Sequence, residues 1–270
     1  MAQVKFFEKS LIDFDQLGVI LTVTDATASN DGADFLTFLQ NRNNDSFWAT
    51  TDSADAANTQ IDIDLGDKNA LDRIILVKHN FKAFTIQYHD GASYTDFSTA
   101  ISETTNTDST TEFTFDSVTI QLIRIIVTGT QVADADKELY QLLICKSLGQ
   151  LTGYPQLKKP VSSLNKTEIK MLSGKRHVVR QRGFFSVDMS VANYNVSADM
   201  AIFESIYFGI NGVLVWINAG DSTQFAREHI GYRGEDIYLM GPKDEYNPEF
   251  YKSYYRAGVK FKIKLVEVVR

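Results

Sequence analysis

The side chains best suited to catalysis are few, and they do not form a recognisable set. The four histidines are His79, His89, His177 and His229. Imidazole titrates near neutral pH and can act as a general base, and His79 and His89 lie in a strand-rich region near Asp90. We nevertheless interpret them as surface or turn residues. No nucleophile elbow, His-Glu-x-x-His pair, Walker loop or dinucleotide fingerprint is present. We therefore expect a protein that is not an enzyme.

Carboxylates offer a second kind of chemistry. Asp62 and Asp64 are two residues apart in an alternating segment, so they share one side of a strand. We interpret them as its solvent side rather than as a working pair. Asn30, Asp31 and Asp34 form an oxygen-rich segment with the ligand types that calcium prefers. Loops favour Asn, Asp and Gly for conformational reasons as well, so a metal site and an ordinary loop both remain open there.

Aromatic side chains suggest a binding surface. Tyr94 and Phe97 follow the turn signal Asp90-Gly91, and aromatic faces provide broad apolar contacts for a ligand such as a sugar. These two residues, in the loop after this turn, are the better candidates for ligand contact in the chain, and partial burial against the protein is the favoured alternative. The single cysteine, Cys145, lies in an apolar segment and is expected to be an inert small hydrophobic residue.

The strongest local charge is a basic segment in the second half of the chain. Its cations are Lys158, Lys159, Lys166, Lys170, Lys175, Arg176, Arg180 and Arg182. Aromatic residues that could stack on bases occur only at its end, at Phe184 and Phe185. We therefore expect no nucleic-acid partner and predict a protein-facing assembly surface that includes Lys175, Arg176, Arg180 and Arg182.

Composition and charge indicate two folded domains. The chain has 270 residues, 44% of them hydrophobic and 23% charged, which is typical of a folded protein. Residues 1–150 hold 10 Lys and Arg against 22 Asp and Glu, a net charge of −12, whereas residues 151–270 hold 17 against 12, a net of +5. The charge changes sign in a Gly- and Pro-containing stretch at residues 149–160. We predict domains at 1–150 and 151–270.

The hydrophobic pattern indicates strands almost throughout. Short apolar or alternating segments occur at 61–65, 73–77, 84–88, 113–128 and 139–145, and again at 185–191, 213–217, 237–240 and 259–265. The first of these is expected to end in a turn at Gly66. One helix is predicted where Met200, Phe203, Ile206, Tyr207 and Ile210 recur at helical spacing. No apolar run approaches the ~20 residues that span a bilayer, and residues 1–8 lack a signal peptide, so we expect cytoplasmic synthesis without membrane insertion.

Two passages of the first half resemble a known family. Residues 44–48 (Asn-Asp-Ser-Phe-Trp) and 60–66 (Gln-Ile-Asp-Ile-Asp-Leu-Gly) are similar to the front of galactose-binding-like domains, also called discoidin or F5/8 type C domains. Residues 84–91 and 124–129 match later strands of the same family. The resemblance implies an all-β fold with a minor helix: a discoidin-like jelly-roll β-sandwich, followed by a second mostly-β domain that contains the helix.

The same resemblance implies roles for individual residues. It places Trp48 in the structural core rather than on a sugar-binding platform. Many members hold calcium partly through a Glu in the last strand, where this chain has Gln141, with Glu138 as the nearby alternative. We therefore expect no cofactor. Calcium is the one candidate, and Gln141 in place of the expected Glu argues against a calcium site.

The second half is similar to virion proteins of tailed bacteriophages, through residues 149–155, 182–188 and 215–220. This resemblance implies a structural subunit of a tail, a baseplate or a related particle, located in the virion. Its partners would be further copies of itself and neighbouring tail proteins. The alternative is a carbohydrate-binding module that recognises a host-surface glycan through the first domain.

Overall fold

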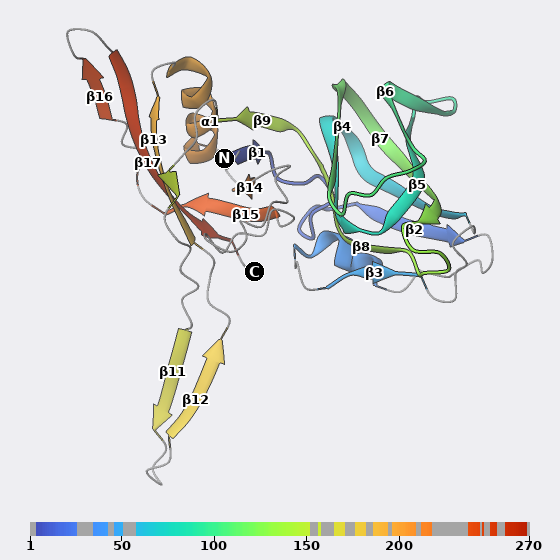
Figure 1. The fold of residues 1–270 in the computed structure, drawn as a ribbon, viewed down its shortest axis with the longest axis horizontal. Helices are drawn as coiled ribbons and strands as arrows, with labels where there is room; N and C mark the ends of the chain where they lie inside the picture. The colour runs from blue at the N-terminus through green and yellow to red at the C-terminus, as the bar shows by residue number, and fades with distance from the viewer. Residues whose placement is uncertain are drawn as a thin grey trace. The chain divides into compact units, whose positions relative to one another are not determined.

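The computed structural model describes fourteen segments of the chain. They are residues 4–25, 35–42, 46–50, 58–151, 156–157, 165–170, 176–181, 186–193, 196–208, 212–217, 237–243, 245, 249–252 and 257–268. These segments are mostly β-strand, and within them there is one α-helix and one short 3-10 helix (Figure 1). The predicted fold class, a mostly-β chain with a minor helix and a sandwich in its first half, is confirmed.

Two compact units make up the chain. The first, called the sandwich unit below, comprises Phe7–Ser147 with Glu235–Ile237. The second, called the C-terminal unit, comprises Met1–Phe6, Leu148–Gly234 and Tyr238–Arg270. Residues 1–6 were predicted to belong to the first domain, whereas the structure groups them with the second. The reason is strand β1 (Val4–Phe7), which lies between β14 (Val213–Ile217) and β9 (Ser147–Gln150) in the large sheet of the C-terminal unit.

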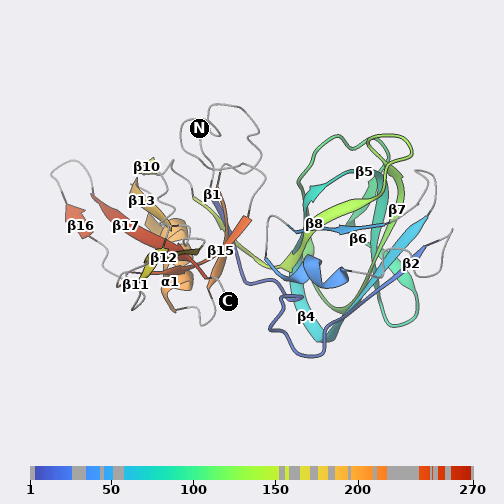
Figure 2. The same cartoon turned by 90° about the horizontal axis from the view of Figure 1, so that it is seen from below.

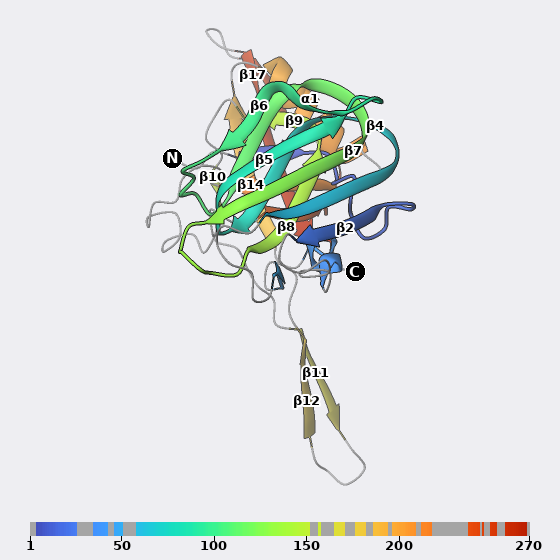
Figure 3. The ribbon, with the colours of Figure 1, turned by 90° about the vertical axis from the view of Figure 1, so that its right-hand side faces the viewer.

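The sandwich unit has two layers that share two long strands. Its elements are β2 (Ile20–Asp25), η1 (Leu36–Gln40), β3 (Trp48–Ala49), β4 (Thr59–His79), β5 (Phe81–His89), β6 (Tyr94–Glu103), β7 (Thr111–Thr130) and β8 (Glu138–Cys145). The first part of β4 pairs with β2 and with the last part of β7, which in turn pairs with β5, and β5 with β6. These five strands lie side by side in Figure 3. The last part of β4 pairs with β8, and β8 with β3; η1 lies beside β8 (Figure 2).

Strand β4 continues through Gly66, where the sequence predicted a turn and a strand end. Gly66 has φ of 78°, and a Cβ added there would lie 3.0 Å from the carbonyl oxygen of Gly18. Only glycine suits this backbone conformation and this close approach. The register between β4 and β7 shifts between Asp64 and Asn69. The glycine therefore marks an irregularity within one long strand, after which β4 contributes to the other layer.

The core of the sandwich unit fills the space between its layers. Trp48 is fully buried there, and its ring meets the edge of Phe81 at a centroid distance of 6.5 Å, which confirms its predicted packing role. Alternate residues of the strands supply the rest of the core, among them Ile61, Ile63 and Ile125. Cys145 is buried, and burial raises the pKa of its thiol well above the ordinary value. Cys145 therefore stays protonated as an unreactive thiol, as predicted.

Among the described residues, the C-terminal unit contains an eight-stranded sheet with a helix packed on it, and a separate two-stranded sheet. The remaining strands of the larger sheet are β10 (Gln156–Leu157), β13 (Ser186–Asn193), β15 (Ile237–Pro242), β16 (Glu249–Lys252) and β17 (Ala257–Glu267). Helix α1 (Val196–Phe208) confirms the predicted helix as far as it is described, since Ile210 lies outside the described residues. Its Ile202, Phe203 and Ile206 join the core with strand residues such as Val215. The two-stranded sheet holds β11 (Asn165–Lys170) and β12 (Arg176–Gln181). No helix in the described residues is long and apolar enough to span a bilayer.

Candidate functional site

The outer face of the five-stranded layer gathers polar and aromatic side chains into one cluster. Asp62 on β4 is the register partner of Arg124 on β7, and Arg124 is in turn the partner of Gln87 on β5. Gln87 is opposite Asp96 on β6. Directly opposed residues of antiparallel strands share a face of the sheet, so these side chains form a row across four strands. We call the row, together with Tyr94, the polar face; Figure 3 looks onto these strands.

Arg124 is the centre of this face. Its Nε donates to Oδ1 of Asp62 at 2.7 Å, and its guanidinium carbon lies 3.7 Å from the centroid of the Tyr94 ring. The Arg124 and Asp62 side chains are 27% and 28% exposed, so both remain reachable from solvent. An ion pair fixes the guanidinium plane, and stacking on an aromatic ring orients it further. The arrangement holds a cation, a carboxylate and a phenol within one small area.

Amide side chains extend the polar face on both sides. Gln60 donates from Nε2 to the second oxygen of Asp62 at 2.6 Å, and Gln87 donates to Asp96 at 3.0 Å. An amide still has an unused oxygen acceptor after such a contact. Burial, and then the nearby Asp62 carboxylate, raises the pKa of the Tyr94 hydroxyl, so this hydroxyl stays protonated and can donate. The face therefore offers both donors and acceptors.

A tight turn positions Tyr94 at the end of β6. Oδ1 of Asp90 accepts hydrogen bonds from the amides of Ala92 and Ser93, both at 2.8 Å. These bonds, the one to Ser93 first, lower the pKa of Asp90. The turn sets His89 opposite Tyr94, with ring centroids 5.1 Å apart in an edge-to-face arrangement. The Asp-Gly turn is thus the local reason why the tyrosine lies over β7.

The two aromatic residues predicted as ligand contacts have different environments. Both lie in strand β6, not in a loop as the sequence suggested. Phe97 is 4% exposed and packs in the core, with its ring centroid 4.1 Å from that of Phe115. It has no free face for a ligand, because it points to the opposite side of the strand from Asp96. Tyr94 is half-buried on the polar face and is retained as a candidate contact.

Asp62 and Asp64 lie on the solvent side of their strand, as interpreted from the sequence, but they have separate partners. Asp64 accepts from the Gly66 amide and from Gln121, both at 2.9 Å, whereas Asp62 pairs with Arg124. They do not converge on a common point. Sequence reasoning did not identify Arg124 as part of a site. The one indication in the sequence was that Arg124 is a lone cation in an alternating apolar strand. Which residues lie beside Arg124 depends on the strand register, and the sequence does not supply that register.

The calcium prediction falls partly outside the described residues, since Asn30, Asp31 and Asp34 all lie there. Gln141, at the position where the family resemblance expects a Glu, is 2% exposed in β8 and carries no charge. In the segments that the structure describes, no group of three or more His, Cys, Asp or Glu side chains could hold a metal ion.

The interpretation of His79 as a surface or turn residue is wrong. His79 is 4% exposed and lies between Phe81 and Phe84. Its Nδ1 accepts from the Phe81 amide at 3.2 Å, and its Nε2 lies 3.0 Å from the Thr111 hydroxyl. Burial lowers its pKa to about 4. Both nitrogens are occupied by structural contacts, so this ring is a neutral core residue.

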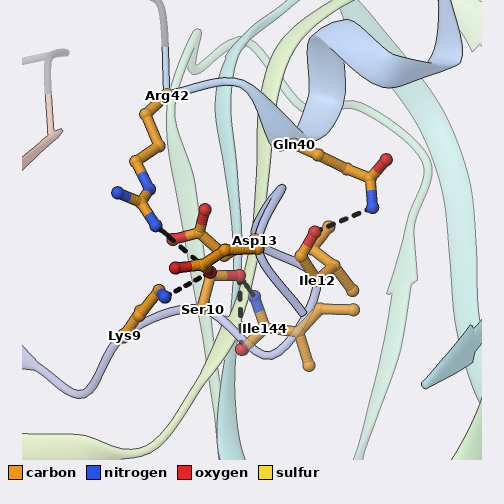
Figure 4. A network of polar contacts seen from close by, with 8 residues as sticks. Lys9, Ser10, Ile12, Asp13, Gln40, Arg42 and Ile144 are labelled. Carbon is orange, nitrogen blue, oxygen red and sulfur yellow. Dashed lines mark hydrogen bonds and ion pairs between the residues drawn. The ribbon is translucent and has the colours of Figure 1, made fainter. Parts of the chain in front are cut away.

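A second polar network ties the N-terminal loop of the sandwich unit to η1 and β8 (Figure 4). Arg42 pairs with the buried carboxylate of Asp13 and lies 3.6 Å from Asp15, which also pairs with Lys9. Around it, Gln40 donates to the Ile12 carbonyl at 2.9 Å, and Ser10 accepts from the Ile144 amide at 3.1 Å. Burial raises the pKa of Asp13, although Arg42 acts in the opposite direction. Two carboxylates are paired with two cations here, so we interpret the network as structural, although Oδ1 of Asp13 and Nε of Arg42 are buried without a hydrogen-bond partner.

The predicted assembly residues are only partly described. Arg176 and Arg180 lie in β12, while Lys175 and Arg182 fall outside the described residues. The backbone register between β11 and β12 is defined along six residue pairs.

Comparison with known proteins identifies the class of the sandwich unit. Residues 24–136 match the family model of the F5/8 type C domain, so the first part of the chain carries a discoidin-like domain, as its motifs indicated. The match ends well before the C-terminal unit. No curated protein matches the chain, and the resemblance to phage tail proteins is not supported by any comparison.

Solved structures show similarity over the same part of the chain. Chitosan-binding module 1 of a Paenibacillus sp. IK-5 chitosanase/glucanase is 18% identical, with a TM-score of 0.39, covering 51% of this chain and 98% of the module. A Clostridium perfringens module in complex with GalNAc-beta-1,3-galactose is 16% identical, with a TM-score of 0.37 and coverages of 48% and 96%. A Ruminococcus gnavus GH29 fucosidase in complex with fucose is 18% identical, with a TM-score of 0.41 and coverages of 52% and 27%. Similarity at this level carries no argument about function.

Proposed function

We propose that the sandwich unit is a carbohydrate-binding module that uses the polar face, centred on Arg124, to bind a glycan. The observation that carries the proposal is the Asp62–Arg124–Tyr94 cluster, which is ordered by its own contacts and is still partly exposed. It lies in a unit that matches the F5/8 type C family. The protein would act by binding alone, with no bond made or broken.

The chemistry of a sugar suits this face. Each sugar hydroxyl both donates and accepts, so a matching surface needs neighbouring donors and acceptors in fixed positions. Arg124 supplies donors only, Asp62 and Asp96 supply acceptors, and the amides of Gln60 and Gln87 supply both. The exposed part of the Tyr94 ring can pack against the C–H groups of a pyranose. Pre-formed contacts reduce the ordering that binding would otherwise require.

The expectation of a tail or baseplate subunit located in the virion stays a prediction, because none of the comparisons bears on it. The polar face provides a specific observation for the glycan-binding alternative, and the proposal follows that observation. The two roles are compatible in principle, since fold alone does not determine function.

A glycan array tests the proposal with the full-length chain and two matched variants. Arg124→Gln removes the cation at the centre of the polar face. Arg73→Gln is the control, because Arg73 also sits on a strand of the sandwich unit and lies 3.3 Å from a carboxylate, Glu112, away from the polar face. We expect wild type and Arg73→Gln to bind the same glycans and Arg124→Gln to lose them at an unchanged melting temperature. The proposal would be contradicted if the wild type bound no glycan on the array. It would also be contradicted if Arg124→Gln bound the same glycans as the wild type.

A further inference from the structure

The β11–β12 hairpin carries an arrangement of charge that the glycan-binding proposal does not use. Lys166 is the register partner of Arg180, and Lys170 is the partner of Arg176. Directly opposed positions of an antiparallel pair share one face, and so do positions two or four apart on one strand. All four cationic positions therefore fall on the same face of the ribbon. Only Glu168 and its partner Val178 lie between them.

This arrangement works against the stability of the hairpin. Like charges placed directly opposite each other destabilise a strand pair, and here two of the six opposed pairs join a lysine to an arginine. The two strands form a sheet of their own, with no further strand paired to them among the described residues. A two-stranded ribbon is marginally stable by itself. An anionic partner placed over this face would remove the repulsion and order the ribbon.

The sandwich unit has an excess of exposed residues of the opposite charge. In the described part of the sandwich unit, eight carboxylate residues are exposed: Glu8, Asp67, Asp90, Asp96, Asp108, Asp116, Asp134 and Asp136. Only three cationic residues there are exposed, namely Lys68, Lys82 and Lys146. Over residues 1–150 the net charge is −12, from 10 Lys and Arg against 22 Asp and Glu. A second copy of this chain therefore offers an acidic partner at equal concentration.

We propose that the cationic face of the β11–β12 hairpin docks on the acidic sandwich unit of another copy. The two surfaces differ, so the contact is head-to-tail and generates either a closed ring or an open stack. Charge attraction of this kind is screened by salt, because the Debye length falls from about 10 Å at 0.1 M to about 3 Å at 1 M. Self-association should therefore weaken as the ionic strength rises.

Sedimentation velocity of the purified full-length chain across a salt series tests this proposal. The neutral variant carries Lys166→Gln, Lys170→Gln, Arg176→Gln and Arg180→Gln. The matched control exchanges the same positions without changing charge: Lys166→Arg, Lys170→Arg, Arg176→Lys and Arg180→Lys. Thermal melting of all three proteins checks that the two compact units remain folded.

We expect wild type and the charge-preserving control to sediment as oligomers at low salt and as monomers at high salt. The neutral variant should stay monomeric throughout. A wild type that is monomeric at every salt and protein concentration would overturn the proposal, as would a neutral variant that assembles like wild type. Nucleic acid is the other kind of anionic partner that a cationic face could bind. A mobility-shift assay with random-sequence double-stranded DNA tests this alternative. DNA binding by a monomeric wild type that the neutral variant lacks would assign the hairpin to nucleic acid instead.

Discussion

Replacing Arg42 by methionine should destabilise the sandwich unit strongly, because it leaves a buried charge without its main partner. The Asp13 side chain is 2% exposed and that of Arg42 is 17% exposed. Removing one member of a buried ion pair costs roughly 3–5 kcal/mol. Lys9 also acts on Asp13, so we expect the lower end, about 3 kcal/mol. For a domain of ~150 residues, each kcal/mol corresponds to roughly 2–4 °C, which gives a fall in melting temperature of roughly 6–12 °C.

The same experiment has an internal control and a pH signature. Asp13→Asn combined with Arg42→Met removes the charge together with its partner and should recover most of the lost stability. Burial raises the pKa of Asp13 in the folded protein, so the folded state binds a proton on this carboxyl more tightly than the unfolded chain does. The unfavourable contribution of Asp13 to the free energy of unfolding therefore diminishes as the pH falls toward ~3.9, the pKa of an Asp in the unfolded chain. Loss of Arg42 leaves that carboxylate less compensated, so the stability deficit of Arg42→Met should shrink as the pH falls from neutral toward ~3.9.

Urea denaturation followed by tryptophan fluorescence and circular dichroism measures these differences. An Arg42→Met protein within ~1 kcal/mol of wild type, the value of an exposed pair, would refute the interpretation of a buried structural network. A double variant no more stable than the single one would do the same.

Three further predictions follow from the described residues. Trp48→Ala should cost roughly 3–5 kcal/mol and leave the sandwich unit poorly folded, because Trp48 is fully buried in the core; normal melting of this variant would contradict its packing role. Chelator should change the melting temperature little, since Gln141 replaces the expected Glu and a tightly bound ion would stabilise the native state by mass action; a large drop restored by calcium would count against this. Because burial lowers the pKa of His79 to about 4, its stabilising contribution should be complete above the unfolded value of ~6.5 and decline as the pH falls toward 4. His79→Gln should flatten that part of the stability curve in urea melts, and an unaltered curve would exclude His79 as its source.

The sequence predicted the fold well because its local signals agreed with one another. Strict alternation at residues 61–65 identified a half-buried strand, and helical spacing identified α1. The Trp48 environment followed from the family resemblance. The predicted end of a strand at Gly66 was wrong. A glycine with positive φ occurs both in turns and in irregularities within a strand, and the sequence does not distinguish the two.

The candidate site was less accessible to sequence reasoning because it depends on register between distant strands. Asp62 and Arg124 are 62 residues apart, and Gln87 reaches Arg124 only through the pairing of β5 with β7. Phe97 was misassigned as a ligand contact because the turn at Asp90-Gly91 was taken to open a longer loop, whereas β6 begins at Tyr94 and buries Phe97 and Ile101. His79 was misassigned because a histidine satisfied inside a core has no distinct sequence signal.

The most direct test of glycan recognition by the polar face is an NMR titration of the labelled full-length chain with an oligosaccharide selected from the array. If the polar face binds the glycan, the side-chain Nε–H of Arg124, the side-chain amide of Gln87 and the backbone amide of Tyr94 shift together in a saturable manner. The amides near Arg73 should stay in place. Saturable shifts confined to other parts of the chain, with the Arg124 and Tyr94 signals unmoved, would contradict glycan binding by the polar face.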